Sequence, residues 1–112
     1  MTYAAFDIIV VPFPYGDRLA EKRRPALVVS APALEIRKGL VWVAMITSAA
    51  HSTGFADCEI HDLASAGLSA RSILRGGKLA SVEPSRVIRR AGSLSAADRN
   101  RAEQVLRSCA AF

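Results

Sequence analysis

The sequence lacks the residue patterns that most directly identify a metal site, a disulfide framework or a nucleotide-binding loop. Its 112 residues include two cysteines and two histidines, with no CxxC, no HExxH and no cluster of cysteine and histidine. The GxSxG, GxGxxG and P-loop motifs are missing as well. The sequence therefore predicts no metal, no cofactor, no structural disulfide and no serine-hydrolase triad.

Long apolar runs are also absent, and the first residues do not have the charged and apolar regions of a secretion signal. These two absences predict a cytoplasmic protein with no membrane partner. A length of 112 residues, half of them apolar, is typical of one folded domain, which we place at residues 1–112.

Acidic residues are the minority among the charged ones: 10 Asp and Glu stand against 15 Lys and Arg, which gives a formal charge of +5. The basic residues are mostly arginine, whose planar guanidinium makes paired hydrogen bonds to phosphate. The charge balance favours an anionic partner, nucleic acid first.

Apolar runs rich in Val and Ile alternate with turn-forming residues, which predicts short strands. We expect strands at 6–11, 25–31, 40–46, 58–61, 72–75, 78–82 and 86–90. Pro12 is expected to stop the first strand and to open a loop of about a dozen residues. Residues 32–39 fit a helical turn or a loop, and Gly67 marks a turn.

The end of the chain has the pattern of a helix. Ser95 stands at an N-cap position with Asp98 three residues later, and Ala102, Val105, Leu106 and Cys109 follow at helical spacing. Short strands followed by one helix predict a mainly β fold with a C-terminal α-helix, arranged as a small β-barrel.

Several polar residues lie where the predicted strands begin or end. Arg24 precedes Pro25 and is therefore held extended, while Thr47 and Ser48 follow the third apolar run. Such hydroxyls could donate to a phosphate oxygen. An arginine at the surface and hydroxyls bonded to their own backbone are ordinary alternatives.

Arg75 and Lys78 flank the pair Gly76-Gly77, which allows a tight turn or a β-bulge. Both could point toward one anion, although an exposed basic pair is also a common solubility feature of strand edges. Arg86, Arg89 and Arg90 fit a solvated basic face.

Together these segments resemble the MazF/PemK toxins of type II toxin–antitoxin systems. The resemblance rests on FDIIVVPFPY at 6–15, KRRPALVVS at 22–30, MITS at 45–48 and SILRGGKL at 72–79. It implies an SH3-like barrel related to MazF and CcdB, working as a homodimer with a cognate antitoxin protein as partner. It also implies a metal-independent, sequence-selective endoribonuclease that cleaves single-stranded mRNA and leaves a 2′,3′-cyclic phosphate.

Carried over by position, the resemblance implies three catalytic residues, Arg24, Thr47 and Arg75. The residues that it places against RNA are Tyr15, Arg18, Lys22, Arg23, Ser48 and Lys78. One departure concerns Gly77, because several members have an acidic residue there. The general base that is proposed at that position in those members is absent from this chain.

Two other functions stay open at the level of sequence. The same barrel topology serves the CcdB-like inhibitors of DNA gyrase, which act through their C-terminal residues, and Phe112 and Trp42 fit such a binding module. A catalytically weak, RNA-binding relative is the other. The Arg24-Pro25 and Thr47-Ser48 segments favour RNA.

Overall fold

The computed structural model describes residues 2–13, 22–49 and 54–112. Its elements in chain order are β1 (Asp7–Phe13), β2 (Lys22–Val28), α1 (Pro32–Lys38), β3 (Val41–Ser48), β4 (Asp57–Ile60), α2 (Leu63–Ala66), β5 (Ser72–Val82), the 3-10 turn η2 (Pro84–Arg86), β6 (Arg89–Ser93) and α3 (Ala96–Cys109).

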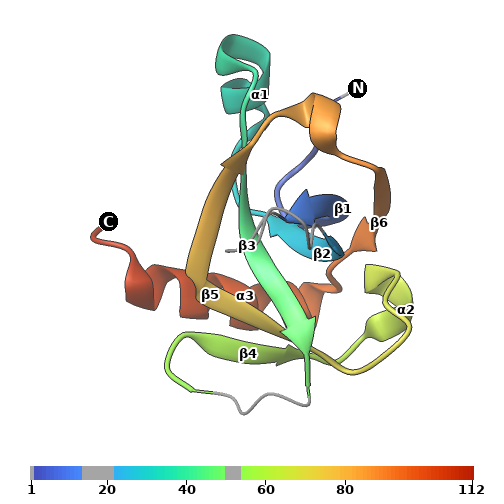
Figure 1. Ribbon diagram of the computed structural model, residues 1–112. Helices are drawn as coiled ribbons and strands as arrows, with labels where there is room; N and C mark the ends of the chain where they lie inside the picture. The colour runs from blue at the N-terminus through green and yellow to red at the C-terminus, as the bar shows by residue number, and fades with distance from the viewer. Residues whose placement is uncertain (1, 14–21, 50–53) are drawn as a thin grey trace.

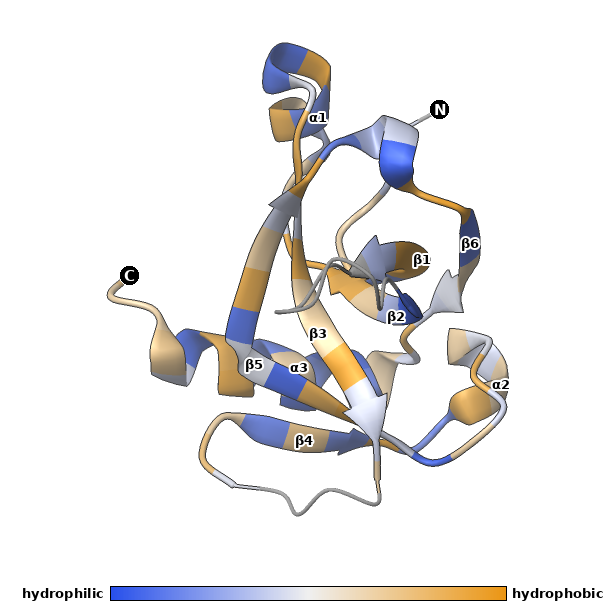
Figure 2. Ribbon diagram, viewed as in Figure 1, coloured by the Kyte–Doolittle hydropathy of each residue, from blue (hydrophilic) through white to orange (hydrophobic). Residues whose placement is uncertain are grey.

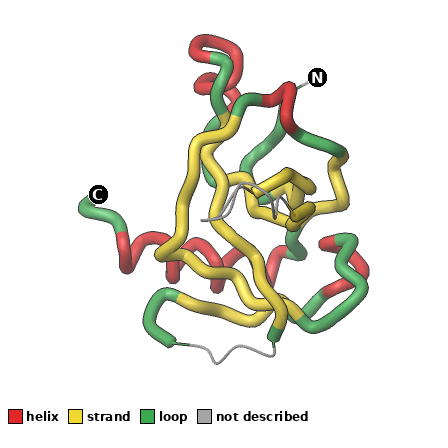
Figure 3. Tube along the Cα trace, viewed as in Figure 1, coloured by secondary structure: helices red, strands yellow, loops and turns green. Residues whose placement is uncertain are grey.

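The strands form one antiparallel sheet of six strands in the order β4-β5-β3-β2-β1-β6. The sheet curls into a half-barrel, and the helices lie at its periphery (Figures 1 and 3). The C-terminal helix α3 packs against β4 and β5. The predicted mainly β fold with a C-terminal helix is therefore confirmed.

Both faces of the curled sheet are buried at its centre, where Figure 2 shows mostly hydrophobic strands. Successive side chains of a strand point to opposite faces, so β2 contributes Leu27 to one face and Ala26 and Val28 to the other. The first face packs under α3 around Ile8, Ile46 and Leu74. The second face carries the other core cluster, which consists of Ile9, Val11, Ala26, Val28, Val41, Val43 and Met45.

Helix α3 begins at the predicted N-cap. The Ser95 hydroxyl accepts a hydrogen bond from the backbone N–H of Asp98 at 3.2 Å. The Asp98 carboxylate accepts from the backbone N–H groups of His61 and Asp62, at 3.1 and 2.8 Å, and also contacts Arg101. Asp98 thereby fixes the start of α3 to the segment that joins β4 to α2.

Acid is expected to weaken the fold through Asp98. Burial alone raises the pKa of this carboxyl, but the N–H groups of Asp62 and His61 and the charge of Arg101 outweigh it, so the pKa lies below its usual 3.8. A pKa lowered by folding gives stability that is present above the unfolded value and is lost from about pH 5 downward. Urea unfolding should show that the difference in free energy of unfolding between wild type and Asp98→Asn becomes smaller between pH 6 and pH 3. A difference that stays constant over this range would contradict the role of the Asp98 carboxylate.

Two prolines lie inside strands, contrary to the expectation that Pro12 would stop β1 and that the second strand would begin at Pro25. β1 continues to Phe13 and β2 already starts at Lys22. At Pro12 the neighbour β6 has ended, and at Pro25 the pairing with β3 has not begun. A missing N–H costs little where one side of the strand is unpaired.

Other predicted boundaries are also wrong. The strands expected at 72–75 and 78–82 are one strand, β5, and the strand expected at 86–90 is replaced by η2 and by β6 at Arg89–Ser93. The short helix α2 precedes Gly67, where only a turn was expected. Cys109, assigned to the apolar face of the last helix, is exposed.

Candidate active site

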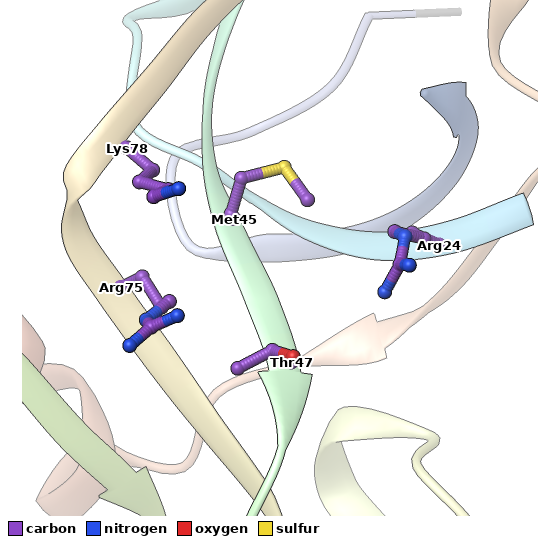
Figure 4. Close-up of a pocket in the computed structure, with 5 residues that line it drawn as sticks. All are labelled: Arg24, Met45, Thr47, Arg75 and Lys78. Atoms are coloured by element: carbon purple, nitrogen blue, oxygen red, sulfur yellow. The ribbon is translucent and has the colours of Figure 1, made fainter. Parts of the chain in front are cut away.

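Three neighbouring strands surround a hollow of about 220 Å³ on the half-barrel. Its lining consists of Arg24 from β2, Met45 and Thr47 from β3, and Arg75 and Lys78 from β5 (Figure 4). Four of these five residues are ones that the sequence singles out. The exception is Met45, which is buried and forms the apolar part of the lining.

Strand alternation explains why Arg24 and Thr47 share the hollow. Arg24 is two residues from Ala26 on β2, and Thr47 is two residues from Met45 on β3, so both continue the face that holds the second core cluster. The apolar face of the sheet thus ends in a cation and a hydroxyl. The packing of that core fixes the direction of both side chains.

A β-bulge brings both cations of β5 to the hollow. Ala44 pairs with Leu79 whereas the next residue of β3, Met45, pairs with Arg75, so residues 76–78 are extra on β5. The bulge is held by the Gly76 N–H, which donates to the Ala56 carbonyl at 2.8 Å. Of the turn and the bulge that Gly76-Gly77 allows, the structure contains the bulge.

Arg75 is held by an acidic residue, Asp57, that no local sequence pattern marks. Asp57 pairs with Arg75 across β4 and β5, and its Oδ2 lies 3.6 Å from the guanidinium. The same oxygen accepts a hydrogen bond from the Gly54 N–H at 3.0 Å, and the Asp57 side chain is only 9% exposed. Within the described part of the chain, Arg24 and Lys78 have no ion-pair partner.

The remaining predicted residues lie around the hollow rather than in it. Ser48 is exposed at the end of β3 and lines a second hollow together with Arg23. Lys22 is exposed at the first position of β2. Tyr15 and Arg18 lie outside the described residues, as does most of the loop expected at 12–23.

No group of three or more His, Cys, Asp or Glu side chains suited to a metal occurs in residues 2–13, 22–49 and 54–112. Cys58 and Cys109 are free thiols, and burial raises the pKa of the Cys58 thiol. Among the helices of the described segments, none has the length and apolar character needed to cross a membrane.

The curled sheet of six strands with its C-terminal helix has the MazF-like fold. The chain belongs to the family of PemK-like, MazF-like toxins of type II toxin–antitoxin systems, whose family model matches residues 4–109. None of the curated proteins matches the sequence significantly.

Solved structures support the same fold at low sequence identity. The chain matches an endoribonuclease from a mycobacterial species, solved with its cognate antitoxin, with a TM-score of 0.76 and 13% identity over 95% of this chain and 92% of the other. The toxin MazF-mt6 of Mycobacterium tuberculosis matches with a TM-score of 0.70 and 20% identity over 91% of this chain and 93% of the other. MazF of Deinococcus radiodurans matches with a TM-score of 0.73 and 23% identity over 97% of this chain and 96% of the other.

Proposed function

We propose that this toxin is a metal-independent endoribonuclease that cleaves single-stranded RNA at the hollow between β2, β3 and β5. The observation that carries the proposal is the convergence of Arg24, Arg75, Lys78 and the Thr47 hydroxyl on one small space. Three cations and a hydroxyl donor match a phosphodiester, whose negative charge increases as the reaction proceeds.

The reaction needs no group from outside the RNA except proton carriers. The 2′-hydroxyl oxygen attacks phosphorus and loses its proton, the bond from phosphorus to the 5′ oxygen breaks, and that oxygen takes up a proton. The products are a 2′,3′-cyclic phosphate and a 5′-hydroxyl. Arginine keeps its proton at neutral pH, so neither Arg24 nor Arg75 readily acts as a base. Their positive charges, together with the Thr47 hydroxyl, stabilise the extra negative charge of the transition state.

The proposed partners follow from the family and from its solved members. One similar mycobacterial endoribonuclease is solved with its cognate antitoxin, and MazF of Deinococcus radiodurans is solved with MazE. We assign this chain a cognate antitoxin that covers the cationic hollow, and a homodimer as its working form. An antitoxin at this position would exclude RNA.

The purified protein, incubated with mixed-sequence RNA in EDTA, is the direct test. We expect cleavage that survives chelation and leaves ends with a cyclic phosphate. Intact RNA together with inhibition of DNA gyrase would instead support the CcdB-like alternative, for which Phe112, 94% exposed after α3, is the structural argument. Binding of RNA without cleavage would identify a catalytically weak relative.

Asp57→Asn should lower the rate of cleavage roughly tenfold while leaving the fold intact. Without the Asp57 charge the Arg75 guanidinium is no longer held in place, and a displaced donor loses much of its effect on the transition state. Asparagine can still accept from the Gly54 N–H, but it no longer holds Arg75 by charge. The loss should fall on kcat rather than on KM, and Asp57→Glu should restore part of it.

The matched control is Glu103→Gln, which removes the same charge from an ion pair with Arg107 on α3. We expect this control to cleave like wild type. If Asp57→Asn kept full kcat, or lost activity only in proportion to a lower melting temperature, Asp57 would have no positioning role.

A further inference from the structure

Strands β2 and β3 separate beside the hollow. In the described part of the chain they pair only where Ala26–Val28 faces Val43–Met45. Beyond this point, residues 23–25 of β2 and 46–48 of β3 are adjacent to each other without forming a ladder. A slot of about 240 Å³ fills the gap, and residues 68–72, which lead into β5, line its remaining side.

The slot opens directly onto the candidate active site. Arg24 and Thr47 line both spaces, because each stands at the border between the hollow and the gap. In RNA, each phosphate is bonded to the sugars of the two nucleotides beside it, and each sugar carries a base. A phosphate held by Arg24 and Thr47 therefore brings one of these bases within reach of the slot.

The lining of the slot combines apolar surface with hydrogen-bonding groups. Pro25 and Leu68, both half-buried, supply apolar contacts. The strand edges facing the slot carry backbone groups that no pairing between β2 and β3 uses. The Ser69 side chain is exposed and has no hydrogen-bond partner among the described residues.

Arg23 adds positive charge at the slot, because it is exposed on β2. Arg71 also lines the slot, but its guanidinium makes a bidentate pair with Glu59 of β4 at 2.9 and 3.1 Å, which offsets its charge. Arg23 and Arg24, beside an apolar space with polar edges, match a nucleotide better than a purely apolar ligand. Single-stranded RNA is read by this combination, in which an unstacked base is held by contacts to its face and hydrogen bonds to its edge.

We propose that the slot between the separated ends of β2 and β3 binds one unstacked base of the RNA strand, next to the scissile phosphate, and sets the sequence preference at that position. This proposal rests on the proposed ribonuclease function and adds a specificity subsite to it. Residues 68–72 form the wall that a base contacts, and the Ser69 hydroxyl contributes to reading its edge.

The test fills the slot with a bulky side chain. Ser69→Phe is compared with wild type and with Ser85→Phe, which places the same side chain on the exposed turn η2, away from the slot. Randomised RNA is cleaved, and the sequences around the cuts are read. Ser69→Phe should lose the preference at one nucleotide position and cleave the favoured sequence roughly tenfold or more slowly. Ser85→Phe should match wild type.

A second measurement separates failure of this proposal from failure of the ribonuclease function. Short RNA oligonucleotides are titrated into the wild-type protein, and the backbone amide NMR signals are followed. Shifts at residues 68–72, lost in Ser69→Phe, support the slot even if no RNA is cut. Unchanged signals there, or a Ser69→Phe protein with the wild-type cleavage preference, would overturn the proposal.

Discussion

Arg24→Ala is expected to lower kcat/KM for RNA cleavage by about 100-fold or more, the usual effect of removing one preorganised transition-state donor. Arg24 lines the hollow opposite the cations of β5, and no ion-pair partner among the described residues shares its charge. The side chain is partly exposed and lies beyond the core residue Ala26. Its loss should therefore leave the melting temperature nearly unchanged.

The measurement is a time course on a defined RNA in EDTA, together with a thermal melt followed by circular dichroism. Arg37→Ala is the control, since it removes the same charge from the exposed face of α1. Equal cleavage by Arg24→Ala and wild type would show that the active site is assigned to the wrong residues. A collapse of the melt would show a structural role instead.

Gly67→Ala is expected to destabilise the protein by about 3–5 kcal/mol, which lowers the melting temperature by roughly 15 °C or more. Gly67 ends α2 with a φ of +70°, and an added Cβ would lie 2.0 Å from the carbonyl oxygen of Ala91. Ala91 belongs to β6, so this oxygen is part of a strand and cannot move cheaply. Backbone strain and collision both oppose the substitution.

Gly39→Ala separates these two causes. Gly39 ends α1 with nearly the same φ, +65°, but its Cβ would meet nothing within 4 Å. Only the strain of the left-handed conformation remains there, about 1–2 kcal/mol. Equal destabilisation by the two substitutions would mean that the contact with Ala91 relaxes freely. Thermal melts of both variants beside wild type decide this.

The residues of the candidate active site were predictable from sequence to different degrees. Arg24 could be found because it precedes a proline and an apolar run, and Thr47 because it follows one. Local pattern alone therefore places each near the end of a strand, although both lie inside β2 and β3. Asp57 could not be found in this way. Its contact with Arg75 depends on the register of β4 against β5 and on the bulge at 76–78, neither of which is a local property.

The sequence by itself determined the class of fold, because alternating apolar residues and the Ser95 cap act over a few neighbouring positions. It also determined which basic and hydroxyl residues are available to a phosphate. The tertiary structure decided how these residues combine. The early end of the pairing between β2 and β3 opened the slot, and the bulge in β5 directed Arg75 and Lys78 toward one space. Both depend on contacts between strands that are distant in the chain, which local preferences do not encode.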